Sequence, residues 1–155
     1  MLILPAVRTA CVTRAALRHC FARGWSPLLE VPLPAALRAD IMALKPDGCF
    51  AILEVKSCAR DFLSDQKWHG YREWCDELHF AVDLDFPQEL IPGDTGLLVA
   101  DGHEAAPVRD APPHPLAPAR RRSLLQRFAR LAAARLALHE DPGGLPEARA
   151  ALLSE

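Results

Sequence analysis

The sequence lacks the motifs that mark the commonest enzyme classes. It has no glycine-rich loop for a phosphate or a dinucleotide and no Gly-x-Ser-x-Gly nucleophile motif. The six histidines and five cysteines show no zinc-binding spacing, and an odd cysteine count without a Cys-x-x-Cys pair predicts reduced, mostly buried thiols. We therefore expect neither an enzyme of these common classes nor a structural zinc site.

Long hydrophobic runs and an excess of positive charge are also missing. The apolar start, MLILPAV, has no basic region before it and ends at Arg8. It therefore predicts neither a signal peptide nor a membrane span, which needs about 20 apolar residues. We expect a cytoplasmic protein without a membrane role. The formal net charge is −2 at pH 7, so any recognition of nucleic acid requires a local basic patch.

What the chain does contain is a core and a hairpin. Half of its 155 residues are hydrophobic, which supports one globular domain. The central stretch, residues 38–56, reads RADIMALKPDGCFAILEVK. Its two apolar runs, residues 39–44 and 49–56, flank a Lys-Pro-Asp-Gly turn, in which Pro presets φ and Gly accepts a positive φ. This pattern predicts a β-hairpin.

Three charges interrupt the apolar hairpin: Asp40, Glu54 and Lys56. Side chains alternate along a strand, so Glu54 and Lys56 share a face and Val55 points to the opposite layer. Folding the hairpin brings Asp40, near the start of the first strand, beside Glu54, near the end of the second. Charges are seldom buried unless they are paired or bind a metal, so this cluster needs an explanation.

Two interpretations of the cluster stay open on spacing alone. In the first, it is a salt-bridged sheet edge in which Lys56 neutralises Glu54. In the second, Asp40 and Glu54 are oxygen ligands of a divalent metal, with the Val55 carbonyl and waters completing an octahedron. Lys56 would then orient or help to deprotonate the water that attacks a phosphodiester.

In the segment after the hairpin, residues 57–78, residues 57–61 predict a loop and the rest predicts an amphipathic helix. Its apolar residues recur at steps of three and four, and Asp61 or Ser64 would cap its start. Trp68 and Tyr71 are expected in the core. Asp65 and Lys67 are either solvated helix charges or additional site residues.

An Asp followed after a hairpin by Glu-x-Lys resembles the PD-(D/E)XK nuclease core, with Ala39 where the usual Pro stands. The following LSDQKW resembles the helix start of the VRR-type branch of these nucleases. By that resemblance Gln66 is a fourth site residue, which reaches toward the metal or the scissile phosphate.

More broadly, residues 13–101 resemble the MmcB-like DNA repair proteins of bacteria. The family label implies a role in DNA repair, and the resemblance to the nuclease core leads us to expect a DNA endonuclease or exonuclease that acts in repair with Mg²⁺, or Mn²⁺ in its place. Asp40 and Glu54 would bind the metal, Lys56 would position the attacking water, and Gln66 would orient water or phosphate. Many nucleases of this core pair up to cut both strands, so a homodimer is a further expectation.

The remaining elements complete an α/β domain. A helix over residues 13–21, a strand over 28–33, the hairpin, the second helix and a strand over 79–84 give the order αβββαβ, and further strands are expected over 96–100 and 105–109. This is a restriction-endonuclease-like core, a mixed central sheet flanked by helices. Glu30, in the first strand, is a candidate additional acid of the site, and otherwise a surface acid.

A basic arm follows the domain of residues 1–110. Residues 111–118 hold four prolines and predict a linker, and residues 119–140 predict a helix packed on the same domain. Residues 146–153 predict a further short helix. Arg120, Arg121 and Arg122, together with Lys67, would contact the DNA backbone, or the arginines would be solvated. The alternative function is a non-catalytic nucleic-acid-binding or partner-binding repair factor.

Overall fold

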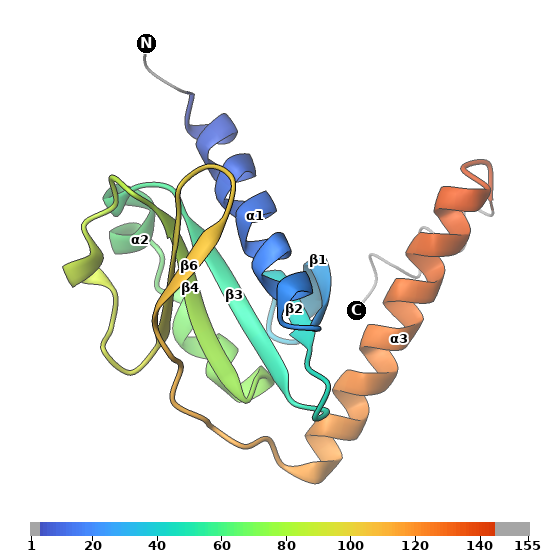
Figure 1. Cartoon of the computed structure of the whole chain (residues 1–155). Helices are drawn as coiled ribbons and strands as arrows, with labels where there is room; N and C mark the ends of the chain where they lie inside the picture. The colour runs from blue at the N-terminus through green and yellow to red at the C-terminus, as the bar shows by residue number, and fades with distance from the viewer. Residues whose placement is uncertain (1–3, 145–155) are drawn as a thin grey trace.

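A mixed six-stranded sheet lies between helices in the computed structural model, which describes residues 4–144 (Figure 1). The strands follow one another in space as β1-β2-β3-β4-β5-β6. β1, β2 and β3 pair antiparallel, β3, β4 and β5 pair parallel, and β6 returns antiparallel to β5. The α/β prediction with a mixed sheet is therefore confirmed. The strands are Ser26–Leu33, Leu37–Leu44, Phe50–Lys56, Glu77–Asp83, Gly96–Ala100 and Ala105–Arg109.

The predicted hairpin joins β2 to β3 and organises the sheet. Its turn closes with a bond from the Gly48 N–H to the Lys45 carbonyl at 2.9 Å. Gly48 has φ +84°, which glycine adopts without the strain of a side chain. The Asp47 carboxylate accepts the Cys49 N–H at 2.9 Å. These contacts fix the register that brings Asp40 near Glu54.

One face of the sheet is covered by α1 (Pro5–Ala22), which begins eight residues before the predicted start. Pro5 stands in the first turn, where its missing N–H would have had no helical partner. Small buried residues on α1, including Ala15, Ala16 and Cys20, allow the helix to lie close to the strands. Val55 belongs to this layer, as the alternation along β3 predicts.

The prediction of a loop over residues 57–61 followed by one amphipathic helix is wrong. The chain forms a short helix, α2 (Ala59–Ser64), and then a 3-10 helix, η1 (Lys67–Trp74). The cap position of α2 is Cys58 rather than Asp61 or Ser64. Between the two helices Asp65 is extended, and its carboxylate accepts the Lys67 N–H at 2.8 Å. A local side-chain bond of this kind competes with helical bonding and ends α2.

The face opposite α1 holds the larger core. Trp68 and Tyr71 from η1 are buried there, as predicted, beside Phe50 and Phe80 of the sheet. The C-terminal helix, α3 (Pro118–Glu140), packs on this same layer. The residues that anchor it are Leu116, Leu124, Phe128 and Leu131. A short helix, η2 (Gln88–Leu90), precedes β5.

Two further expectations concern membrane-spanning helices and the end of the chain. In the described part of the chain, no helix is long and apolar enough to cross a membrane. The short helix expected over residues 146–153 lies outside the described residues.

Candidate functional site

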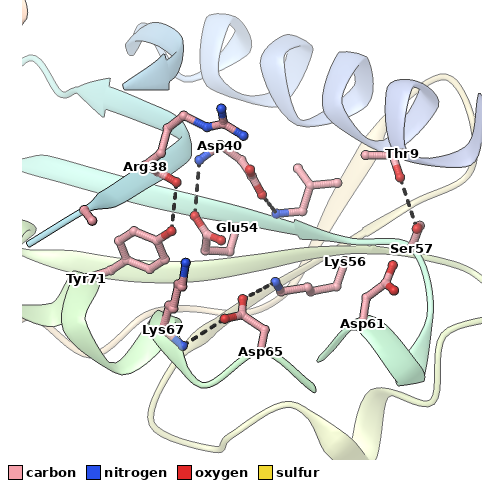
Figure 2. Close-up of a pocket in the computed structure, with 12 residues that line it drawn as sticks. Thr9, Arg38, Asp40, Glu54, Lys56, Ser57, Asp61, Asp65, Lys67 and Tyr71 are labelled. Atoms are coloured by element: carbon pink, nitrogen blue, oxygen red, sulfur yellow. Dashed lines mark hydrogen bonds and ion pairs between the residues drawn. The ribbon is translucent and has the colours of Figure 1, made fainter. Parts of the chain in front are cut away.

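The site lies where the ladder between β2 and β3 ends. The last pair of the antiparallel register is Ile41 with Leu53. At the next position the backbone groups bond to carboxylates instead: the Asp40 N–H donates to Glu54 Oε1 at 3.2 Å, and the Val55 N–H donates to Asp40 Oδ2 at 2.8 Å (Figure 2). The two acidic side chains thus replace the backbone pairing at this position, and they lie close together, as the hairpin predicted.

Burial makes this carboxylate pair electrostatically expensive. Glu54 is only 3% exposed. Burial and the neighbouring Asp40 charge raise the pKa of Glu54 to about 8. Burial also raises the pKa of Asp40, although the Val55 N–H and the Lys56 charge oppose that rise. Two adjacent carboxyl groups that resist ionisation are a place where a bound cation would be strongly favoured.

Lys56 supplies positive charge nearby but is paired elsewhere. Its side chain is largely buried, and its ammonium lies 2.5 Å from Asp65 Oδ2. Burial acts to raise the pKa of Asp65, but the bonds from Lys56 and from the Lys67 N–H outweigh it and lower the pKa. Within residues 4–144, Lys56 forms no ion pair with Glu54, so a sheet edge in which Lys56 neutralises Glu54 is not what the structure contains.

These groups line a pocket of about 480 Å³. Ser57, at the end of β3, and Thr9, from α1, place hydroxyls 3.1 Å apart at one wall. Tyr71 closes another wall and donates its hydroxyl proton to the Arg38 carbonyl at 2.8 Å. The charged lining residues, seen in Figure 2, are Arg38, Asp40, Glu54, Lys56, Asp61, Asp65 and Lys67.

Two predicted site residues lie outside the pocket lining. Gln66 is exposed, and its amide nitrogen lies 3.4 Å from the Leu63 carbonyl, because the break after α2 turns this residue away. Glu30 pairs with Arg38, with Oε2 at 2.6 Å from Nε, instead of lining the pocket. Lys67, in contrast, does line it.

The three adjacent arginines of α3 occupy different environments. Arg121 forms two bonds with the buried Asp76 carboxylate, at 2.7 and 2.8 Å. Arg120 donates to the Glu73 carbonyl at 2.9 Å, and its guanidinium lies over the Trp74 ring. Arg122 is exposed.

The oxygen donors at the open ladder suit a hard divalent cation. Among the described residues, no group of three or more His, Cys, Asp or Glu side chains forms a metal cluster. Mg²⁺, however, commonly uses one or two carboxylates and keeps several waters. The Val55 N–H points toward β2, and in an extended strand the carbonyl of the same residue points to the same side. Asp40, Glu54 and the Val55 carbonyl are therefore a donor set that fits such an ion.

Sequence reasoning missed several lining residues. Arg38 stands two positions before Asp40, but Ala39 and Ile41 belong to opposite core layers, so alternation along β2 breaks here and did not place Arg38. Ser57 directly follows Glu-x-Lys, and this adjacency was a usable signal. Thr9 and Asp61 approach through the packing of α1 and α2, for which the sequence gives no local indication.

Comparison with known proteins gives two matches. A family model described as "DNA repair protein MmcB-like" matches residues 6–143. A solved structure of a protein of unknown function from Silicibacter pomeroyi superposes with a TM-score of 0.83 at 45% sequence identity, over 94% of this chain and 97% of that one. No curated protein matches the sequence.

Proposed function

This chain belongs to the MmcB-like DNA repair family, and from that premise we propose that it is a Mg²⁺-dependent deoxyribonuclease of the PD-(D/E)XK type. The observation that carries the proposal is the opened ladder between β2 and β3. There the buried Glu54 carboxylate lies beside the half-buried Asp40 carboxylate. Each accepts a backbone N–H, and within residues 4–144 neither forms an ion pair.

Asp40, Glu54 and the Val55 carbonyl would hold the metal in this proposal. Each carboxylate uses one oxygen for a backbone N–H, which leaves the other, Asp40 Oδ1 or Glu54 Oε2, for a ligand. A bound Mg²⁺ supplies Lewis acidity to a phosphodiester and makes water a better nucleophile. The pair itself must lose any proton that Glu54 holds near neutral pH before it can bind the ion.

Lys56 and Lys67 serve the substrate side of the pocket. Asp65 holds the Lys56 ammonium on the same strand face as Glu54, where a fixed positive charge stabilises the charge that develops on phosphate. Asp65 is thus a positioning residue for Lys56, whereas Gln66 lies outside the pocket lining. Lys67, exposed at the start of η1, is available to a phosphate oxygen.

A cleavage assay tests the proposal. Supercoiled plasmid and labelled single- and double-stranded oligonucleotides are incubated with wild type in Mg²⁺, Mn²⁺ or EDTA. We expect cleavage that EDTA abolishes and that Asp40→Asn, Glu54→Gln and Lys56→Ala each reduce by about 10²-fold or more. Glu89→Gln, an exposed acid on η2, is the matched control and should retain full activity. Cleavage that survives in Glu54→Gln would refute the metal-nuclease proposal.

A non-catalytic DNA-binding or partner-binding repair factor is the second candidate function. It is favoured by the absence of a cluster of three metal ligands among the described residues and by the exposed Arg122 on α3. Such a factor would keep its function when Asp40 or Glu54 is replaced and lose it when Arg122 is replaced. Arg121 is unsuitable for this comparison because it holds Asp76.

A further inference from the structure

The pocket presents a problem for any phosphate that approaches it. Four acids line it, namely Asp40, Glu54, Asp61 and Asp65, against three cations, Arg38, Lys56 and Lys67. Like charges close together repel strongly where water is partly excluded. One metal ion offsets part of this repulsion, and the ammonium of Lys56 is already engaged by Asp65. A phosphodiester therefore needs cations whose charged ends are still available, and these are on Arg38 and Lys67.

Arg38 is held in place by two contacts. Its Nε lies 2.6 Å from Glu30 Oε2, and its backbone carbonyl accepts the Tyr71 hydroxyl. Glu30 is itself fixed, because Arg135 of α3 donates to the Glu30 carbonyl at 2.8 Å. Glu30 has φ +48°, an uncommon conformation for a residue with a side chain, at the position opposite Asp40 in the β1–β2 register. This local distortion of β1 presents the Glu30 carboxylate to Arg38.

The guanidinium keeps donors free for a ligand. Its side chain is 68% exposed, and within residues 4–144 its two terminal nitrogens have no hydrogen-bond partner. Guanidinium groups offer five donors in a planar fork that matches two phosphate oxygens. The group also lies close enough to Asp40 for its charge to act on that carboxyl and oppose the effect of burial on the Asp40 pKa.

We propose that Arg38 binds a phosphate of the substrate strand beside the Asp40–Glu54 pair, across the pocket from Lys67. Arg38 comes from β2 and Lys67 from η1, so the two cations stand on different walls of one pocket (Figure 2). Glu30 orients the guanidinium and leaves its outer edge for the ligand. The inference rests on the proposed function, because it assigns the substrate-binding residue of that same site.

The test measures DNA affinity without cleavage. Fluorescence anisotropy of labelled single-stranded and duplex oligonucleotides is recorded in EDTA at several salt concentrations, for wild type, Arg38→Ala, Arg38→Lys and Arg14→Ala. Arg14 is an exposed arginine of α1, outside the pocket lining, and serves as the matched control. Because Arg38 is largely exposed, the alanine variant should fold, which thermal denaturation verifies.

We expect Arg38→Ala to weaken binding by about tenfold and to lower the slope of log K against log salt by about 0.7–0.9, the value for one lost phosphate contact. Arg38→Lys should recover part of the affinity, and Arg14→Ala should match wild type in affinity and slope. If wild type binds and cleaves DNA but Arg38→Ala keeps its affinity and slope, the assignment of Arg38 is wrong and the nuclease proposal stands. If wild type binds no DNA in any form and cleaves none, both are wrong.

Discussion

Two buried carboxylates at opposite ends of β3 have the same exposure and opposite chemistry. Asp76 and Glu54 are each 3% exposed. Asp76 accepts the Phe50 N–H at 2.7 Å, the Leu116 N–H at 2.9 Å and both arms of Arg121, and despite burial these bonds lower its pKa. Glu54 accepts a single N–H, from Asp40 at 3.2 Å, and its pKa rises to about 8.

The comparison shows that the hydrogen-bond partners of a buried acid, rather than burial itself, decide whether its pKa rises or falls. A fully bonded carboxylate such as Asp76 ties elements together: it joins the start of β3 to the segment before α3 and to α3 itself. Glu77, which bonds Lys45 and His79, behaves the same way, and its pKa falls to about 2. An acid left short of donors beside a second acid gains most from an added cation.

The largest effect on folding should come from removing Asp76, the carboxylate whose hydrogen bonds are all formed. Asp76→Ala leaves the Phe50 and Leu116 N–H groups without their acceptor and Arg121 without its partner. Removing one member of a buried ionic network typically costs about 3–5 kcal/mol. We therefore expect the free energy of unfolding to fall by about 3–5 kcal/mol, measured by urea denaturation.

A surface ion pair between η1 and α3 provides the control. Glu73 lies 3.8 Å from Arg120, and both side chains are well exposed. Such pairs contribute about 0–1 kcal/mol, so Glu73→Ala should unfold at nearly the same urea concentration as wild type. Equal losses in Asp76→Ala and Glu73→Ala would contradict the structural role of Asp76.

The contribution of Glu54 to the free energy of unfolding should change with pH in the sense opposite to that of Asp76. Folding raises the pKa of Glu54 from 4.5 to about 8, so the folded state holds a proton that the unfolded state has released between these values. The free energy of unfolding of wild type should therefore fall as pH rises from about 4.5 to about 8. Glu54→Gln keeps an oxygen for the Asp40 N–H and cannot ionise. It should be more stable than wild type at pH 8.5 by about 1–3 kcal/mol, since each unit of pKa shift is worth about 1.4 kcal/mol and coupling to Asp40 reduces the total.

Urea denaturation of both proteins from pH 5 to pH 9 measures this difference. Glu89→Gln, the exposed control, should follow the wild-type curve. Asp76 adds the opposite trend at low pH: its pKa is lowered, so its contribution is present above pH 3.8 and is lost as pH falls through the folded value. A Glu54→Gln variant that is less stable than wild type at pH 8.5 would show that the ionised Glu54 stabilises the fold.

The smallest effect should come from the exposed arginine of α3. Arg122→Ala should change the free energy of unfolding by less than about 0.5 kcal/mol, because exposed positions contribute little. If α3 lies along DNA, the same variant should weaken DNA binding by about two- to fivefold in an anisotropy titration. Arg121→Ala should instead destabilise the fold, since it leaves Asp76 unpaired. The reverse order, with Arg122 critical for folding, would contradict this division.

Turn residues and strand alternation, both read from neighbouring residues, were sufficient to predict the Asp40–Glu54 pair at the centre of the site. The turn before Cys49 and the alternation along β3 placed Asp40 beside Glu54 and separated Val55 into the other layer, because strand geometry is fixed by neighbours in the sequence. The order of helices and strands followed from hydrophobic periodicity in the same way. These features depend on contacts that the hairpin itself determines.

The residues in the wall of the pocket could not be predicted in the same way, because local side-chain bonds and distant contacts override the hydrophobic periodicity there. Periodicity after residue 61 favoured one helix, but the Asp65 side chain accepts the Lys67 N–H and the chain turns between α2 and η1. That turn gives Lys56 its partner and moves Gln66 to the surface. The bond between Asp76 and Arg121 spans 45 residues, so no sequence pattern reveals that one arginine of the basic run is structural.

Calorimetric titration of Mg²⁺ into wild type and Glu54→Gln at pH 7.5, in two buffers of different ionisation enthalpy, tests the central claim that the Asp40–Glu54 pair is a cation site. We predict that wild type binds a single Mg²⁺ with release of up to one proton, because the pKa of Glu54 near 8 keeps part of that carboxyl protonated beforehand. Glu54→Gln should bind more weakly and release no proton. Absence of binding to wild type with and without DNA, or equal binding by the two proteins, would contradict the claim.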